Sequence, residues 1–245
     1  MSIPDRNIII LFFLLILSFS CEKKNCLSSA GSSVSEERIL PRFQYIDAYD
    51  NFQIYLQNDT VHKVLIETGE KLMPFIETYV QNDTLIIKDN NTCNFLKNYP
   101  KRTIYISVDT LKHIDINNAA DLFTVDTFRV KSCSVRFLGD IGSCDLSVDA
   151  YVFQLQIWYA SGDFKIKGKA YSSYLSAEQT SFIYADSLQN TVCHAYNNSK
   201  GDIYAQSGRY FYYRLKDTGN IYYSGNPDTI IVQEHSGTGK LIKKD

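Results

Sequence analysis

Several common functional signatures are missing from the 245-residue sequence. It has no Gly-x-Ser-x-Gly, His-Glu-x-x-His or Cys-x-x-Cys motif, and no glycine-rich loop that runs into Lys-Ser or Lys-Thr. The sequence therefore lacks the usual marks of a serine hydrolase, a zinc protease, a redox dithiol and a phosphate-binding loop. We predict no catalytic residue, no metal site and no cofactor, and we do not expect an enzyme.

Basic charge, long apolar runs and clustered histidines are also scarce. The net charge is −2 and the isoelectric point is about 6.1. A dedicated nucleic-acid binder needs a basic stripe, so none is expected here. The histidines are isolated in sequence, at His62, His113, His194 and His235. The longest apolar run, Ile8 to Leu17, is shorter than the about 20 residues that a membrane-spanning helix needs.

This apolar run has the length and flanks of a secretory signal sequence. Arg6 precedes it, and Ser18-Phe19-Ser20-Cys21 follows it. Small residues that end in a cysteine resemble a bacterial lipobox, in which the cysteine is acylated and becomes the first mature residue. We expect residues 1–21 to be a lipoprotein signal peptide and Cys21 to anchor the chain to the outer membrane, on its periplasmic or surface side. An ordinary secretory signal is the alternative.

Residues 22–37 predict a flexible tether between this anchor and the folded body. The segment contains five serines and almost no large apolar residue, so it cannot bury enough surface to offset the entropy of ordering. Lipidation of Cys21 leaves five cysteines: Cys26, Cys93, Cys133, Cys144 and Cys193. No spacing selects a disulfide pair among them. The last three lie in alternating apolar stretches, where we expect small buried hydrophobes.

Seven large apolar residues after residue 120 each follow a short polar or glycine-containing block. They are Leu122, Leu146, Phe164, Ile183, Ile203, Ile221 and Leu241, with gaps of 24, 18, 19, 20, 18 and 20 residues. A period near 20 residues predicts stacked units that bury their apolar faces against one another. Within the units apolar residues alternate, as in Phe164/Ile166, which is typical of half-buried strands. Residues 109–245 are therefore expected to form a β-solenoid, or β-helix-like stack, of about seven coils.

Residues 38–108 predict a small antiparallel β part that precedes this stack. The sequences Gln57-Asn58-Asp59-Thr60 and Gln81-Asn82-Asp83-Thr84 lie between apolar strands and are expected to close two hairpins. One helical turn, limited by Pro74, is expected between them. The predicted fold class is all-β throughout.

Several segments resemble the auto-transporter adhesin head GIN domain family, a domain of unknown function in lipoproteins of Bacteroidota. They are residues 42–43, 54–56, 67–74, 91–96, 219–227 and 235–241. The most specific reads Gly219-Asn220-Ile221-Tyr222-Tyr223-Ser224-Gly225-Asn226-Pro227. The resemblance implies an all-β body over residues 38–245, with a solenoid-like C-terminal half and no assigned catalytic residues. The turns at 117–120 and 179–181 depart from the family's Gly-Ser-Gly pattern.

Tyrosine is the one residue type in clear excess. There are 18, of which 12 lie at or beyond Tyr151. Where two aromatic residues are adjacent on a strand, one must face outward. We predict a ligand-binding stripe of outward rings formed by Tyr159, Tyr174, Tyr204, Tyr213 and Tyr222. The alternative is that these rings cap a thin core.

Together these features predict an exported, lipid-anchored cell-envelope protein of binding or adhesin type. Its expected partners are the membrane, through the lipid on Cys21, and a glycan, a peptide or an envelope protein, but no nucleic acid. Two alternatives stay open, because fold alone does not fix function. One is a structural envelope component without a small ligand. The other is a carbohydrate-active enzyme on a β-solenoid, whose only candidate cluster is Asp145, Asp149, Asp163, Lys165, Lys167 and Lys169.

Overall fold

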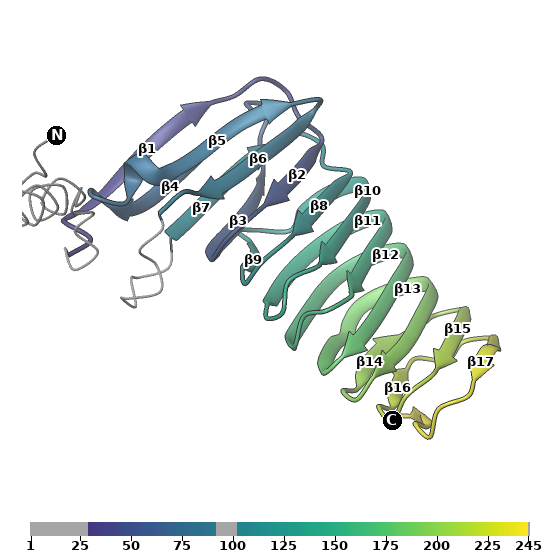
Figure 1. Ribbon diagram of the computed structural model, residues 1–245. Coiled ribbons are helices and arrows are strands. Elements are labelled where there is room, and N and C mark those ends of the chain that lie inside the picture. Colours follow the sequence, from purple (N-terminus) through teal and green to yellow (C-terminus); the bar gives the residue numbers. More distant parts are fainter. Residues whose placement is uncertain (1–28, 92–101, 245) are drawn as a thin grey trace, which may run out of the picture. The chain divides into compact units, whose positions relative to one another are not determined.

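Strands make up most of the computed structural model, which describes residues 29–91 and 102–244 (Figure 1). The described residues other than Ser29 belong to one compact unit. The signal peptide, Cys21 and residues 22–28 of the expected tether lie outside the described residues, as do Cys26 and Cys93. Within the described part of the chain, no helix is long and apolar enough to cross a membrane.

The described part of the chain contains 18 strands and one 3₁₀ turn. In chain order they are β1 (Ser33–Ile39), β2 (Tyr45–Ala48), β3 (Phe52–Asn58), β4 (Lys63–Gly69), η1 (Met73–Phe75), β5 (Ile76–Gln81), β6 (Thr84–Asp89), β7 (Arg102–Val108), β8 (His113–Ile116), β9 (Asp121–Thr124), β10 (Phe128–Phe137), β11 (Ser143–Ile157), β12 (Gly162–Gln179), β13 (Ser181–Ser199), β14 (Ile203–Gln206), β15 (Tyr210–Leu215), β16 (Ile221–Ser224), β17 (Thr229–His235) and β18 (Leu241–Lys243). Buried and exposed positions alternate along most of them, as the apolar pattern predicts.

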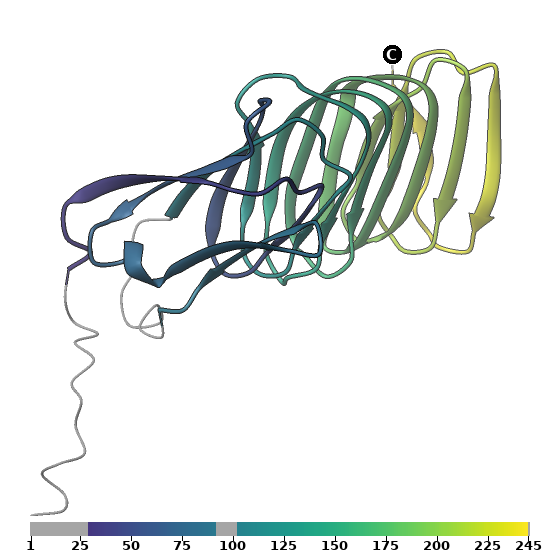
Figure 2. The ribbon, with the colours of Figure 1, turned by 90° about the horizontal axis from the view of Figure 1, so that it is seen from above.

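From β8 onward the chain winds into a stack of parallel strands, seen from above in Figure 2. The first face joins β7, β3, β9, the starts of β11 to β13, and then β14, β16 and β18. The second face joins β6, β2, β8, the ends of β10 to β13, and then β15 and β17. A linking side, formed by the start of β10 and the middles of β11 to β13, connects the two faces. The predicted β-solenoid of about seven coils is confirmed.

The repeat residues form one inward column on the first face, with one change of register. The column runs through Leu122, Cys144, Phe164, Ile183, Ile203, Ile221 and Leu241. Leu146 is also buried, but it lies two residues further along the strand, opposite Ile166. Cys144 therefore takes the level that the sequence pattern assigned to Leu146. The irregular gaps of 24 and 18 residues become 22, from 122 to 144, and 20, from 144 to 164.

The N-terminal part is antiparallel only at its outer strands. β5 and β6 form the hairpin predicted at residues 81–84, and Asn82 and Asp83 take the positive φ angles of 51° and 62° that such a turn needs. The hairpin predicted at residues 57–60 is wrong. β7 lies between β3 and β4, parallel to β3 and antiparallel to β4. β1 then pairs antiparallel with the other edge of β4.

The parallel stack begins earlier than the expected boundary at residue 109. β2 and β3 pair in parallel with β8 and β9, so residues 45–58 already form a coil. The strands from β4 to β7 extend the two faces away from this coil. Strand β1 begins at Ser33, so residues 33–37 of the expected tether belong to the sheet.

The turns that lead into the first face bring successive coils very close together. A Cβ atom on Gly201 or Gly219 would lie 2.2 or 1.9 Å from the carbonyl oxygen of Ser181 or Gly201, respectively. Only glycine fits such an approach. The corresponding turn at residues 179–181 has no glycine, and Ser181 is held there because its backbone N–H donates a hydrogen bond to Oγ of the buried Ser199 at 3.1 Å. The preceding Gln179 supplies the left-handed conformation, with φ of 61°.

Three cysteines lie in the core as free thiols, as the sequence predicts. They are Cys133, Cys144 and Cys193. Burial raises the pKa of Cys133 and Cys193 to about 12, and it raises the pKa of Cys144 as well. Since the thiolate is the reactive form, these residues act as small apolar side chains and not as nucleophiles at neutral pH.

Candidate functional site

The outward positions of the first face form one continuous column of side chains. It runs through Tyr105, Tyr55, Phe123, Asp145, Lys165, Tyr184, Tyr204, Tyr222 and Ile242, each opposite the next in the strand register. Because adjacent strands lie about 4.8 Å apart, planar side chains at successive levels can stack. The column thus holds two aromatic runs separated by two charged residues.

Both aromatic runs are stacked. The N-terminal ladder consists of Tyr105, Tyr55 and Phe123, with ring centroids 5.0 and 4.9 Å apart. The C-terminal ladder consists of Tyr184, Tyr204 and Tyr222, with centroids 5.3 and 4.8 Å apart and ring planes within 9° of parallel. These distances are typical of favourable aromatic pairs. A ring inside a ladder has a neighbour on each face, so it offers solvent mainly its edge and its hydroxyl group.

Phe123 and Tyr184 end the two ladders and direct one ring face each towards the same gap. They are three strand spacings apart, which is roughly 14 Å, and Asp145 and Lys165 occupy the two levels between them. Two adjoining depressions of about 390 and 260 Å³ lie here and share Asp145 and Lys167 in their linings. We call this region, bounded by Phe123 and Tyr184, the slot.

The lining of the slot between the two rings is mostly polar. It includes the hydroxyl groups of Thr124, Thr127, Ser147 and Ser187, the carboxylates of Asp126, Asp145 and Asp186, and the amino groups of Lys165 and Lys167. The Lys167 amino group donates to the Asp145 carboxylate at 3.2 Å, and both side chains are about half exposed. An ion pair this exposed is worth about 0–1 kcal/mol, so a ligand can displace it. The slot therefore combines two stacking faces with a dense set of donors and acceptors.

A third aromatic stack lies on the second face, and its polar groups contact one another. Tyr174, His194 and Tyr212 stack with centroids 4.1 and 4.5 Å apart. Burial lowers the pKa of His194 below its usual value, so its ring is neutral at pH 7. The His194 Nδ1 atom lies 3.2 Å from the hydroxyl group of Tyr196. The Arg214 guanidinium lies over the Tyr196 ring, 4.9 Å from its centroid. These groups satisfy one another, which favours a structural role.

The five tyrosines predicted to form one stripe lie in different settings. Tyr204 and Tyr222 belong to the C-terminal ladder, and Tyr174 belongs to the second face. Tyr159 lies in the turn after β11 and is 54% exposed. Tyr213 faces the core and is 7% exposed, so its predicted outward orientation is wrong. The five rings do not make a single stripe, and ligand binding by those on the surface stays a prediction.

Phe123, Tyr55 and Tyr184 are not among the residues that the sequence analysis selected. A usable signal was present, because the outward position directly follows the inward repeat residue. Phe123 follows Leu122, and Tyr184 follows Ile183. Applying the repeat period to these following positions would have found Phe123, Lys165 and the C-terminal ladder. It would not have found Tyr55 and Tyr105, which precede the repeat, or Asp145, because the pattern placed Leu146 at that level.

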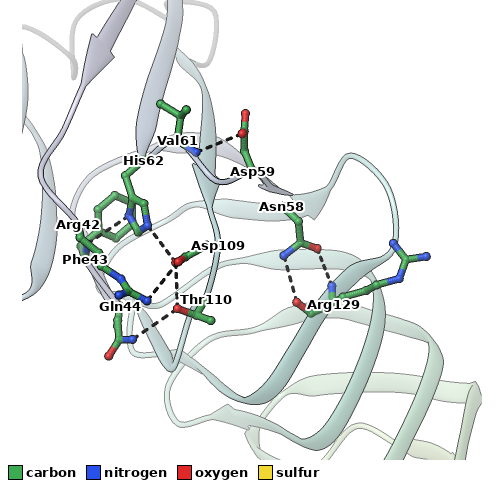
Figure 3. A network of polar contacts seen from close by, with 10 residues as sticks. All are labelled: Arg42, Phe43, Gln44, Asn58, Asp59, Val61, His62, Asp109, Thr110 and Arg129. Carbon is green, nitrogen blue, oxygen red and sulfur yellow. Dashed lines mark hydrogen bonds and ion pairs between the residues drawn. The ribbon is translucent and has the colours of Figure 1, made fainter.

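A histidine–aspartate pair near the start of the stack forms hydrogen bonds within the protein through both ring nitrogens of the histidine (Figure 3). The His62 Nε2 atom lies 2.9 Å from Asp109 Oδ1, and the backbone N–H of Phe43 donates to His62 Nδ1 at 3.2 Å. The ring proton therefore sits on Nε2 and is donated to Asp109. Burial alone would raise the pKa of Asp109, but hydrogen bonds from Thr110 and His62, together with the Arg42 charge, lower it. With both ring nitrogens occupied, His62 is not placed to act as a base.

A second charged cluster lies on the second face. Asp115 Oδ1 accepts hydrogen bonds from His113 Nε2 and Arg136 Nε, both at 2.7 Å. Burial opposes ionisation of Asp115, but these two partners outweigh it and lower its pKa to about 2. Burial and the nearby Asp115 charge raise the pKa of Asp47. Across the described residues, no group of three or more histidine, cysteine or acidic side chains is arranged to hold a metal ion.

The fold and this surface define a class: a parallel β-solenoid that begins with a small antiparallel part and carries aromatic ladders on one face. The family model described as "Putative auto-transporter adhesin, head GIN domain" matches residues 42–227. The chain belongs to this family, as its sequence resemblance implies. No curated protein matches the chain.

Several solved structures share the fold. A "putative adhesin" from Bacteroides fragilis NCTC 9343 is 20% identical, with a TM-score of 0.76 over 87% of this chain and 97% of that chain. A "putative adhesin" and a "putative lipid binding protein", both from Parabacteroides distasonis ATCC 8503, are each 16% identical, with TM-scores of 0.63 and 0.62. They cover 87% and 88% of this chain and 98% of their own. At these identities the similarity shows the fold and no more.

Proposed function

We propose that this protein is an exported, lipid-anchored cell-envelope protein that binds a ligand in the manner of an adhesin. The observation that carries the proposal is the slot, where two ring faces and a set of polar side chains converge on a hydrogen-bonded β-stack. Concave sites with a few stacking surfaces and convergent polar groups are typical of ligand-binding regions. Membership of a family described as adhesin-like supports the same conclusion.

The anchoring part of the proposal rests on the sequence. The apolar run and the lipobox-like segment that ends at Cys21 support export and acylation. Acylation alone would hold the body at the outer membrane, on its periplasmic or surface side. The carbonyl oxygen of Ala30 already accepts a hydrogen bond from the backbone N–H of Lys71, which leaves residues 22–29 as the segment between the anchor and the body.

A structural envelope component is the second candidate, and a specific observation favours it. On neighbouring strands of the solenoid, Asp145 lies opposite Lys165 and Asp149 lies opposite Lys169. Such cross-strand pairs of opposite charge give an evenly charged, solvated surface. A protein that only spaces or reinforces the envelope would need no more than this.

Binding is favoured over catalysis by the state of the titratable groups. His62 and His194 are held by neighbouring side chains, and the buried thiols have raised pKa values. The carboxylates of the slot lie beside lysines in a solvated setting. This setting suits hydrogen bonding to a ligand better than the tuned acid and base that glycoside hydrolysis needs.

Two measurements on the full chain test the proposal. In detergent phase partitioning of cells that express the protein, the wild type should enter the detergent phase and Cys21→Ala should enter the aqueous phase. The purified full chain should also bind at least one component of a panel of glycans, peptides and isolated envelope fractions. Binding to nothing on the panel, combined with an altered envelope permeability in a deletion strain, would favour the structural component instead.

A further inference from the structure

We infer that the slot is a binding site for a neutral saccharide, whose sugar rings stack on Phe123 and Tyr184 and whose hydroxyl groups bond to the side chains between them. The inference rests on the proposed binding function and adds the place and the chemical class of the ligand. Its support comes from three features of the slot: the two open ring faces, their separation, and the charge of the lining.

Phe123 and Tyr184 are the two ladder ends next to the slot, whereas the other two ends, Tyr105 and Tyr222, lie opposite Leu65 and Ile242 in the strand register. Tyr55 and Tyr204 lie between two stacked neighbours, so a ligand meets their edges. Phe123 is covered on one side by Tyr55, and Tyr184 is covered on one side by Tyr204. The stacked neighbour also holds each end ring in a fixed orientation. A rigid ring face of this kind binds the apolar side of a pyranose at low entropy cost.

The separation of the two faces matches stacked rings. Three strand spacings leave two strand levels without an aromatic ring between Phe123 and Tyr184, each about 4.8 Å deep. Centroid distances of about 4.5–7 Å are favourable for ring stacking, so each end face can take one sugar ring. The two levels hold only the outward chains of Asp145 and Lys165, which are flexible and can move aside. A bent or branched oligosaccharide can therefore touch both faces.

The polar lining selects against other ligand classes. Three carboxylates and two ammonium groups leave the slot with one excess negative charge. This disfavours acidic sugars and nucleic acid, which would bring further negative charge. Val125 is the one aliphatic side chain of the lining with substantial exposed surface, since Ile166 is 1% exposed, and this is too little for an acyl chain. The alternation of hydroxyl and carboxylate groups suits a ligand with many hydroxyl donors and acceptors.

The test uses the purified full chain in detergent and saturation-transfer NMR with defined probes. The neutral probes are the trisaccharides of the cello-, malto-, xylo- and chito- series, and the acidic probe is trigalacturonate. We expect binding of at least one neutral probe, with little binding of the acidic one. Phe123→Leu and Tyr184→Leu should each weaken that binding at least tenfold. Lys165→Trp should also abolish it, because the new ring fills the slot from an exposed position.

Matched controls separate loss of the site from loss of the fold. Tyr105→Leu removes the far end of the N-terminal ladder, and Tyr151→Leu removes an exposed stacked ring on the linking side. Both should bind the neutral probe as the wild type does. Thermal unfolding of all variants shows whether each is folded. Lys165→Trp keeps the test valid if either leucine variant fails to fold, since Lys165 is exposed.

The possible outcomes distinguish this inference from the proposed function. Neutral-sugar binding that falls in the slot variants and survives in the controls supports both. Sugar binding that the slot variants leave unchanged overturns the slot while the binding role stands. Binding only to trigalacturonate, to peptides or to envelope proteins overturns the neutral-saccharide inference and still supports a binding protein. No binding to any of these overturns both.

Discussion

Ile203 offers a direct test of the coil register, because it is fully buried between Ile183 and Ile221 in the inward column of the first face. Ile203→Ala removes three carbon groups from the core. At about 0.8 kcal/mol for each buried group, the loss is about 2.4 kcal/mol before the cavity that remains is counted. Large-to-small core substitutions of this kind cost about 2–5 kcal/mol in total. Ile203→Asp adds an unpaired buried charge and should unfold a domain whose stability is about 5–15 kcal/mol.

The matched control is Ile230→Ala, the same change at an inward position of the last coil. Ile230 lies opposite Phe211 but is 39% exposed, because within the described residues β17 pairs only with β15 and no strand covers its other side. Its truncation should cost no more than about half as much as that of Ile203. Urea unfolding followed by circular dichroism gives the change in free energy, and hydrogen exchange shows whether coils near residue 203 open separately. Equal costs at the two positions would refute the register and the direction of burial.

Two further predictions concern a turn and a charged cluster. Gly219→Ala places a Cβ atom 1.9 Å from the Gly201 carbonyl oxygen and should lower the melting temperature strongly. In the control Gly208→Ala, the nearest contact of the new Cβ atom would be 3.2 Å away, so the melting temperature should fall much less. Similar losses in the two variants would contradict the close approach of the coils. Asp115 has its pKa lowered to about 2 beside Arg136, so its stabilising effect is present above about pH 4, the ordinary range for aspartate, and is lost as the pH falls towards 2. The wild type should therefore have a higher melting temperature than Asp115→Asn at pH 7, and the difference in melting temperature should shrink between pH 4 and 2. A difference that stays constant with pH would rule out this charge effect.

The coil period could be predicted because it depends on residue types that recur locally along the chain. Each turn needs small or polar residues, and each strand start needs a large apolar residue such as Phe164 or Ile203, so both repeat together along the chain. The register at one level could not be predicted this way. Cys144 is small and weakly apolar, and the larger Leu146 two residues later gave the stronger signal. Both residues face the core because strand positions alternate.

The first predicted hairpin failed for a reason that local sequence does not contain. The chain does reverse direction between β3 and β4, but the partner of β3 is β7, which follows about 50 residues later in the chain. Long-range pairing of this kind depends on which strand completes the stack, and not on turn residues. The surface site was partly visible, since Tyr204 and Tyr222 were selected from composition. Phe123 and Tyr184 each follow a repeat residue and could have been selected from the period, but the pairing of Phe123 with Tyr55 and Tyr105 joins strands far apart in the chain and appears only in the structure.

The distance across the slot is a whole number of strand spacings, and this limits how the length of such a slot can change. Deleting or adding one coil between Phe123 and Tyr184 would shorten or lengthen the gap by one strand spacing, about 4.8 Å, and by no intermediate amount. Gradual side-chain substitution would alter which groups line the gap but not its length. A protein built on this plan would thus change the size of the molecule it accommodates in discrete steps, one coil of about 20 residues at a time, while each remaining coil keeps its own contacts.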